Sequence, residues 1–169
     1  LLKLSMEIET AHYIEQVGTW PTEGRNILAN YDDESVVVFQ AYGPEIGRFV
    51  IRNGYFGGQW RLDRASWIKT NFLWLMHRTS WATTPGQDIV LGVRIRRSFF
   101  DQLLREAVAS SMIDDIYASN ESWRSTLRRS PIRFQWDPDW SPAGARCERR
   151  ALQIGIRGPL LRRYAKEEI

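Results

Sequence analysis

The stretch Ser35-Val-Val-Val-Phe-Gln-Ala-Tyr-Gly-Pro44 joins a run of β-branched residues to a turn that ends in proline. Three consecutive valines and a phenylalanine favour a buried strand, because such side chains pack well on a pleated surface. Pro44 suits the first position of a helix, where its missing backbone N–H would have had no partner. Apolar residues from Ile46 to Val50 keep helical spacing, and Gly54 supplies a left-handed stop. We therefore expect a strand, a tight turn and a short helix.

Patterns elsewhere predict further elements around this unit. Apolar runs and alternation predict strands over 88–95, 132–136 and 150–156. Helices are expected over 71–79, over 121–129 and from Pro159 onward. Thr70 is the expected cap of the first of these helices, and a further helix is expected to begin at a capping box formed by Ser98 and Asp101.

The order of these elements predicts the fold class. Residues 1–30 are polar and interrupted by glycine and proline, so they are expected to form an N-terminal arm without a helix. Met6 is a candidate native start, in which case Leu1 to Ser5 come from cloning or from an upstream start codon. Strands and helices alternate only loosely over residues 31–169. We predict a single α+β domain there, with a bent, mostly antiparallel sheet and packed helices.

Composition limits the function classes. The chain has one cysteine and two histidines, too few for a disulfide or a multi-ligand zinc cluster, and we expect no bound metal. No apolar run approaches the roughly 20 residues of a membrane span, so a cytoplasmic protein without a membrane partner is expected. The net charge is +3, and 20 of the 23 basic residues are arginine, which binds phosphate and stacks on rings. A GC-rich genome would also explain the arginine content.

Familiar catalytic motifs are absent from the sequence. Neither a GxGxxG nor a GxxxxGK[ST] phosphate-binding loop is present, which argues against a Rossmann dehydrogenase and a Walker-type kinase. His77 is the only histidine in a structured segment, and its position suits the edge of a core better than a catalytic base. The carboxylate pair Asp137 and Asp139 resembles a solvated turn cluster.

Polar residues inside apolar elements are the best candidate site residues. Gln40 closes the first strand and Gln153 lies inside the last, and a buried amide must bridge backbone edges or face a pocket. Arg64 and Ser66 share a face of an extended segment, next to Trp67 and Lys69. Cations beside an indole can bind a phosphate and a base. The alternative is a surface salt-bridge cluster with Asp63.

Three tryptophans at seven-residue intervals mark the segment from 67 to 81. One continuous helix would align them, because seven residues return to nearly the same face. The helix over 71–79 covers only Trp74, which we assign to the core. Trp67 and Trp81 then lie on either side of it, so Arg78 and Trp81 complete the candidate site on the far side of the helix.

Several segments resemble one known family. Tyr31-Asp-Asp-Glu-Ser-Val-Val-Val-Phe-Gln-Ala-Tyr42, Trp67-Ile-Lys69, Phe72-Leu-Trp-Leu-Met76, Gln135-Trp-Asp-Pro138 and Arg150-Ala-Leu-Gln-Ile-Gly155 are similar to the domain-of-unknown-function family numbered 4291. This resemblance covers about residues 25 to 169 and implies no particular activity.

The opening strand, turn and helix also resemble those of ADP-ribosyltransferase-like enzymes, including some that modify nucleic acid. This resemblance implies NAD as cofactor. The family's His or Arg at the end of the first strand, and its hydroxyl residue two positions on, correspond to Gln40 and Tyr42. Its catalytic Glu in the last strand corresponds to Gln153, which is not a carboxylate, and Glu148 would take that place only in another register. The implied catalytic residues are therefore Gln153 and Gln40.

Three hypotheses about function remain open. The first is a nucleotide- or nucleic-acid-directed transferase with NAD as donor, in which Gln40, Tyr42, Arg64, Ser66, Trp67, Lys69, Arg78 and Trp81 bind the cofactor. The second is a non-catalytic module that binds a nucleotide or nucleic acid through an arginine-rich face. The third is a structural or partner-binding domain. The sequence does not indicate an oligomeric state.

Overall fold

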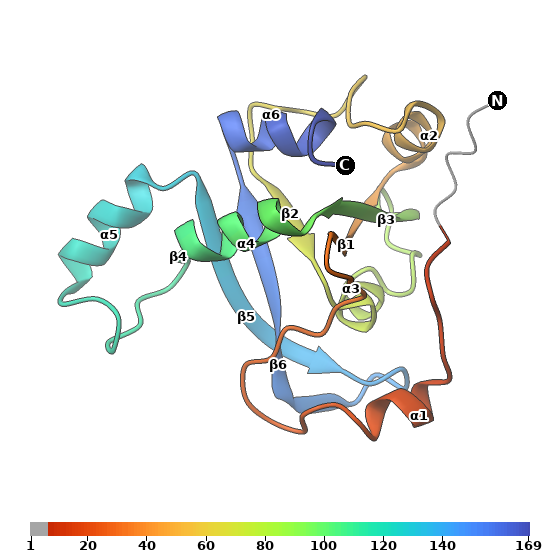
Figure 1. Cartoon of the computed structure of the whole chain (residues 1–169), viewed down its shortest axis with the longest axis horizontal. Coiled ribbons are helices and arrows are strands. Elements are labelled where there is room, and N and C mark those ends of the chain that lie inside the picture. The colour runs from red at the N-terminus through yellow and green to blue at the C-terminus, as the bar shows by residue number, and fades with distance from the viewer. Residues whose placement is uncertain (1–6) are drawn as a thin grey trace.

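A computed structural model describes residues 7–169, and Figure 1 shows their arrangement. The strand order is β3-β1-β2-β6-β5-β4, and every neighbouring pair is antiparallel except β4 with β5. The predicted α+β fold with a mostly antiparallel sheet and packed helices is confirmed. The prediction about Leu1 to Ser5 lies outside the described residues. The strands are β1 (Ser35–Tyr42), β2 (Ser66–Lys69), β3 (Ile89–Arg96), β4 (Val108–Ala109), β5 (Ile132–Trp140) and β6 (Arg146–Ile156), and the helices are α1 (Tyr13–Val17), α2 (Pro44–Asn53), α3 (Phe72–Arg78), α4 (Arg97–Glu106), α5 (Asn120–Arg129) and α6 (Pro159–Lys166).

The β-branched run forms the centre of one half of the sheet. Residues 35–40 are all buried, and β1 pairs with β3 along its whole length, from Ser35 opposite Arg96 to Tyr42 opposite Ile89. The turn and helix after it are as predicted. Pro44 begins α2, and Gly54 ends it with a φ of 75°, in the left-handed region that glycine enters without strain.

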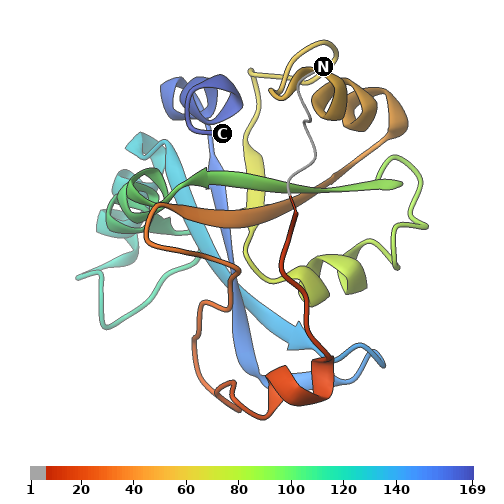
Figure 2. The ribbon, with the colours of Figure 1, turned by 45° about the vertical axis from the view of Figure 1, so that its right-hand side comes forward.

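Helices cover both faces of the sheet. Side chains from α2, α4 and α6 pack with Val36, Val38 and Ile154 in the larger core. On the opposite face, Trp74 and Leu75 of α3 pack with the other side chains of β1, as predicted for Trp74. Figure 2 shows α3 on the other side of the β1–β3 strands from α2 and α6. Because β1 contributes to both cores, its residues are apolar at nearly every position.

Two helix starts differ from the predictions. The N-cap of α3 is Asn71, whose side chain accepts a hydrogen bond from the backbone N–H of Trp74. The predicted cap, Thr70, comes one residue earlier and its side chain is buried. Helix α4 begins at Arg97, so Ser98 lies inside it and forms no capping box. Asp101 pairs instead with Arg97 one turn earlier.

The hairpin of β5 and β6 extends beyond the rest of the sheet (Figure 1). Asp137 and Asp139 lie in β5, so their assignment to a turn was wrong. Asp139 is buried and its carboxylate accepts a hydrogen bond from the buried Arg149 guanidinium at 2.5 Å. The arm contacts this end of the hairpin, since the Trp20 ring lies 5.2 Å from the Arg149 guanidinium. The arm also contains the short helix α1, contrary to the prediction that glycine and proline interrupt any helix there.

Candidate functional site

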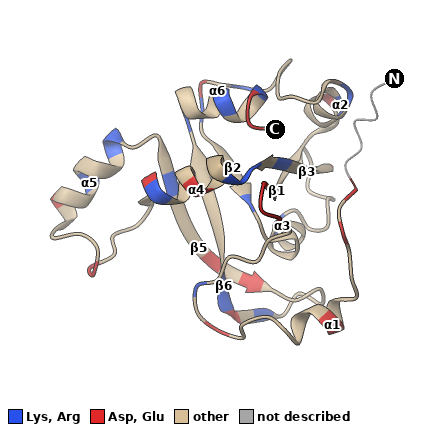
Figure 3. Cartoon of the chain, in the orientation of Figure 1, with Lys and Arg blue, Asp and Glu red and all other residues tan. Residues whose placement is uncertain are grey.

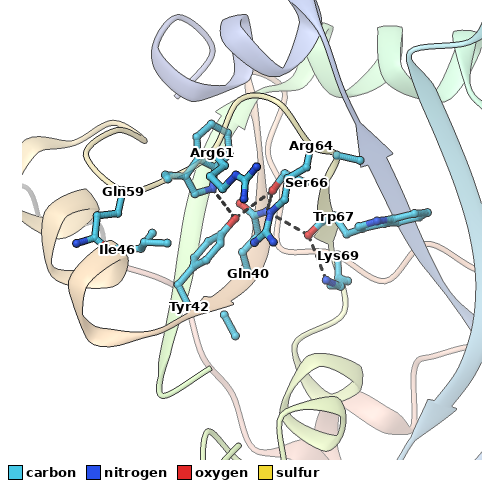
Figure 4. A pocket seen from close by; sticks show the side chains of 12 residues that line it. Gln40, Tyr42, Ile46, Gln59, Arg61, Arg64, Ser66, Trp67 and Lys69 are labelled. Atoms are coloured by element: carbon cyan, nitrogen blue, oxygen red, sulfur yellow. Dashed lines mark hydrogen bonds between the residues drawn. The ribbon is translucent and has the colours of Figure 1, made fainter. Parts of the chain in front are cut away.

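Strands β1 and β2 separate after a single paired position, and a cavity lies where they part. Phe39 opposite Lys69 is the only register pair between them. Beyond it, β1 continues beside β3, while β2 continues beside β6, with Trp67 opposite Gly155. The cavity has a volume of about 460 Å³, within the range typical of small-molecule sites, and Figure 4 shows its lining. We call it the β1–β2 cleft; its lining residues are Gln40, Ala41, Tyr42, Ile46, Gln59, Trp60, Arg61, Arg64, Ala65, Ser66, Trp67 and Lys69.

The Gln40 side chain bridges the two strands across the gap. Its amide nitrogen donates to the Ser66 hydroxyl at 2.7 Å and to the Trp67 carbonyl at 3.1 Å. Its amide oxygen accepts a hydrogen bond of 2.6 Å from the hydroxyl of Tyr164, a fully buried residue of α6. The amide therefore takes the place of the backbone donor that a continued ladder would have supplied to Trp67. This explains a glutamine at the end of an otherwise apolar strand.

A second hydrogen-bond chain lines the cleft beside Gln40. The Trp60 indole N–H donates to the Tyr42 hydroxyl at 2.9 Å, and that hydroxyl lies 3.0 Å from the Ser66 hydroxyl. Burial raises the pKa of Tyr42 above its usual value, so the phenol stays protonated at neutral pH. When Tyr42 donates to Ser66, the serine oxygen accepts from both neighbours and its own proton is free to point into the cleft.

Two arginines stand at the mouth of the cleft. Arg61 pairs with Asp63, and both side chains are exposed. Arg64 forms no hydrogen bond or ion pair with any residue in the range 7–169, and its side chain lines the cleft. The predicted alternative, a salt-bridge cluster of Arg64 with Asp63, is therefore replaced by an Arg61–Asp63 pair. Arg64 remains available to an anion.

Lys69 lies at the inner end of the cleft. Its ammonium group donates to the Trp67 carbonyl at 3.1 Å and lies 5.5 Å from the centre of the Trp74 ring. The pKa of Lys69 is lowered to about 8, first by burial and then by the charge of Arg78, with the charge of Asp137 acting in the opposite direction. A large part of the Lys69 population is therefore a neutral amine in mildly alkaline solution.

A row of polar side chains continues from Lys69 across the sheet. Lys69 pairs with Gln153 of β6, and Gln153 pairs with Gln135 of β5, so the three side chains share one face. The amides of Gln135 and Gln153 donate to the two carboxylate oxygens of Asp137 at 2.7 and 2.6 Å. Asp137 is a candidate functional residue that the sequence reasoning missed. The predicted strand ended at Trp136. Had it been extended by one residue, the spacing of two between Gln135 and Asp137 would have placed both side chains on one face.

Of the remaining predicted site residues, one lines the cleft only in part and the other three lie outside it. Trp67 contributes its backbone to the cleft, but its ring points toward β5 and β6 (Figure 4). Arg78 acts on Lys69 through its charge, from the end of α3. Trp81 is 51% exposed and follows α3, away from the cleft lining. Gln153 does not line the cleft and reaches it only through its neighbour Lys69.

Comparisons with known proteins place the cleft inside a defined family. A family model described as domain of unknown function (DUF4291) matches residues 26–169. The chain belongs to the DUF4291 family. The match includes all six strands and every helix after α1, so each cleft residue of this DUF4291 domain lies within it. No curated protein and no solved structure matches the chain.

The described part of this DUF4291 chain offers neither a cluster of metal ligands nor a membrane-spanning helix. Residues 7–169 contain no group of three or more His, Cys, Asp or Glu side chains arranged to hold a metal ion. Within the same residues, no helix is both long and apolar enough to cross a membrane.

Proposed function

We propose that the β1–β2 cleft binds NAD and that the protein transfers its ADP-ribose part to a nucleotide or nucleic acid. The main support for this proposal is that most of the residues predicted to bind the cofactor lie around the same cavity. Six residues predicted to bind the cofactor, two from β1 and four from the segment 64–69, line one cavity: Gln40, Tyr42, Arg64, Ser66, Trp67 and Lys69. A dinucleotide needs cations for its pyrophosphate and hydroxyl groups for its riboses, and this lining supplies both.

The lining suggests an orientation for the donor. Arg64 at the mouth binds the pyrophosphate, because a guanidinium group donates two parallel hydrogen bonds to phosphate oxygens. The hydroxyls of Tyr42 and Ser66 lie deeper and hydrogen-bond the nicotinamide ribose or the carboxamide. This orientation brings the ribose carbon that bears the nicotinamide toward Lys69.

Lys69 is the proposed base of the transfer. The bond between the ribose carbon C1′ and the nicotinamide nitrogen breaks, and the nicotinamide leaves with the electron pair. The acceptor's nucleophilic oxygen or nitrogen forms a new bond to C1′ and passes its proton to the Lys69 amine. A pKa of about 8 suits this task, because a general base works best near the operating pH.

The two glutamines predicted as catalytic have positioning roles in this proposal. The three hydrogen bonds of the Gln40 amide all go to protein groups, so it shapes the cleft instead of contacting the reacting atoms. Gln153 holds the Asp137 carboxylate, whose negative charge acts on Lys69. The resemblance implies a catalytic glutamate in the last strand. In this proposal the carboxylate of Asp137, on the neighbouring strand β5, acts in its place through its charge on Lys69.

Release of nicotinamide tests this proposal. The full chain is incubated with millimolar NAD, with and without a single-stranded oligonucleotide acceptor, and free nicotinamide is measured by chromatography. We expect release that increases between pH 7 and pH 9 as Lys69 loses its proton. Arg64→Ala removes a charge-assisted hydrogen bond worth about 1.5–3 kcal/mol and should slow release at limiting NAD by about 10- to 100-fold.

An exposed arginine on α2 provides the matched control. Arg48→Ala makes the same change in net charge outside the cleft lining, and release should be unchanged. Equal losses in Arg48→Ala and Arg64→Ala would assign the effect to overall charge and contradict the site. An absence of release from every combination of NAD and oligonucleotide would reject the transferase and favour a module that binds without reaction.

A further inference from the structure

A second cavity, lined by arginines, lies on the other side of the Trp67 strand. Its volume is about 680 Å³, and the ring of Trp67 forms part of its wall. Trp67 and Arg64 line both cavities, so the second one adjoins the β1–β2 cleft. We call it the arginine cavity; the basic residues in its lining are Arg64, Arg129, Arg133 and Arg157.

The positive charge of this cavity is not balanced by its own lining. Asp63 is the only acidic residue among the lining residues, and its carboxylate pairs with Arg61. Arg129 and Arg133 form no ion pair with any residue in the range 7–169. A concave surface with several unpaired guanidinium groups concentrates anions, because the low-dielectric walls focus the field.

One of the arginines is held in place by hydrogen bonds to the backbone, and a second is partly buried beside it. The Arg157 guanidinium donates to the backbone carbonyl of Ser130 at 2.9 and 3.2 Å and to that of Arg128 at 2.8 Å. Arg133 has a buried Nε that no protein group accepts from within residues 7–169. Its guanidinium also has no carboxylate partner within these residues, so its charge is available to a ligand in the cavity. The site is therefore preorganised for an anion.

The indole ring lies flat along the same wall. Trp67, Gly155 and Arg133 face one another across β2, β6 and β5. A Cβ at Gly155 would lie 2.9 Å from the ring carbons of Trp67, so the ring packs directly on the β6 backbone. One ring face covers the strand, and the ring also borders the cavity beside a guanidinium. An aromatic face next to cations is the arrangement that single-stranded nucleic acids bind.

We propose that the arginine cavity binds the phosphodiester backbone of a single-stranded nucleic acid, with one unpaired base stacked on Trp67. A base pair in a duplex cannot present its face to a ring set against the sheet, which favours a single strand. Helix α5, which ends at the cavity residue Arg129, carries two further exposed arginines, Arg124 and Arg128, and Figure 3 shows basic residues on this helix. The strand can therefore continue from the cavity along this helix.

The position of Lys69 connects this cavity with the proposed reaction. Lys69 lies two residues after Trp67 in β2, on the same face, which corresponds to about 6.6 Å along the strand. A base stacked on Trp67 therefore lies near the amine proposed to accept its proton. This role of the strand as acceptor rests on the proposed function, whereas binding of the strand does not require NAD.

Fluorescence anisotropy with labelled ten-nucleotide single strands of DNA and RNA, without NAD, tests the proposal. We expect binding at low salt that weakens steeply with salt, by a slope of about 0.7 for each phosphate contact. Arg129→Ala should reduce that slope by about one contact. Trp67→Ala should weaken binding by about tenfold or more, and Trp67→Phe should retain most of the affinity because it keeps a stacking face.

A control arginine lies at the far end of the same hairpin. Arg146 is exposed and begins β6, nine residues before Gly155, which places it about 30 Å away along the strand. Arg146→Ala should leave both affinity and slope unchanged. Circular dichroism of each variant establishes that the fold is retained before its binding is compared.

Four results would overturn the proposal: no binding of either strand at low salt, equal weakening by Arg146→Ala and Arg129→Ala, unchanged binding in Trp67→Ala, or tighter binding of a duplex of the same length. If neither strand binds, calorimetric heat with inorganic phosphate would show that the cavity takes up only a free anion. Strand binding with the expected variants but no release of nicotinamide would keep this site and reject the NAD-dependent transfer. Release of nicotinamide without strand binding would keep the NAD-dependent reaction and reject the strand site in the arginine cavity.

Discussion

Replacing Gln40 by leucine tests the structural role of the amide at the point where β1 and β2 part. The change keeps the side-chain volume but removes three hydrogen bonds. Ser66 keeps its contact with another hydroxyl, and the Trp67 carbonyl keeps the Lys69 donor. The Tyr164 hydroxyl, which is fully buried, loses its only hydrogen-bond partner within residues 7–169. The unpaired Tyr164 hydroxyl accounts for most of the expected loss of stability.

The magnitude follows from these contacts. A buried hydroxyl without a partner costs about 1–3 kcal/mol, and each lost neutral hydrogen bond about 0.5–1.5 kcal/mol, so Gln40→Leu should cost about 3 kcal/mol. For a chain of this length, this corresponds to a decrease in Tm of roughly 6–12 °C. Urea unfolding followed by circular dichroism measures the free energy of unfolding directly.

A double-mutant cycle separates the cost of the unpaired Tyr164 hydroxyl from the other costs of Gln40→Leu. Tyr164→Phe removes the hydroxyl, so adding it to Gln40→Leu should cost little or restore about 1–3 kcal/mol. The cycle should therefore give a coupling energy well above 0.5 kcal/mol. Additive losses would refute the reasoning, because they would mean that the Gln40 amide and the Tyr164 hydroxyl do not depend on each other.

Three further predictions concern single residues. Between pH 8 and 10.5, Lys69 keeps its proton in the unfolded chain but has lost it in the folded protein, so the stability of the wild type should rise with pH relative to Lys69→Met. Urea unfolding at each pH measures this difference, and parallel stability curves would contradict it. Asp139→Ala leaves Arg149 as a buried charge without its carboxylate and should cost about 3–5 kcal/mol in the same assay, and a loss below 1 kcal/mol would count against the buried pair. Gly155→Ala forces the Trp67 ring off β6 and should weaken oligonucleotide binding severalfold in anisotropy while costing about 1–3 kcal/mol of stability; unchanged binding would show that the ring position is unimportant.

Local chemistry made the first strand and helix predictable. The valine run of β1, Pro44 at the start of α2 and Gly54 at its end each have one strongly preferred backbone state. The sequence also drew attention to Arg64, Ser66 and Lys69, because polar residues in a mostly apolar segment need partners or a ligand. These predictions rest on residues within about ten positions of one another.

Long-range pairing accounts for what the sequence did not predict. The separation of β1 from β2 depends on β2 pairing with β6, about 87 residues later, and no local pattern encodes it. Asp137 was assigned to a turn because its pairing with Asp139 resembles a solvated cluster, whereas β5 continues through both residues with an irregular register at Pro138. The direction of the Trp67 ring likewise depends on Gly155, a residue of another strand.

Calorimetric titration of the full chain with NAD is the most direct test of the β1–β2 cleft as a cofactor site. The account predicts measurable heat with a dissociation constant in the millimolar range or tighter, about −4 kcal/mol or more in binding free energy. This heat should be strongly reduced in Arg64→Ala and retained in Arg48→Ala. Absence of heat at millimolar NAD, or equal heat in the two variants, would contradict the assignment of the cleft to NAD.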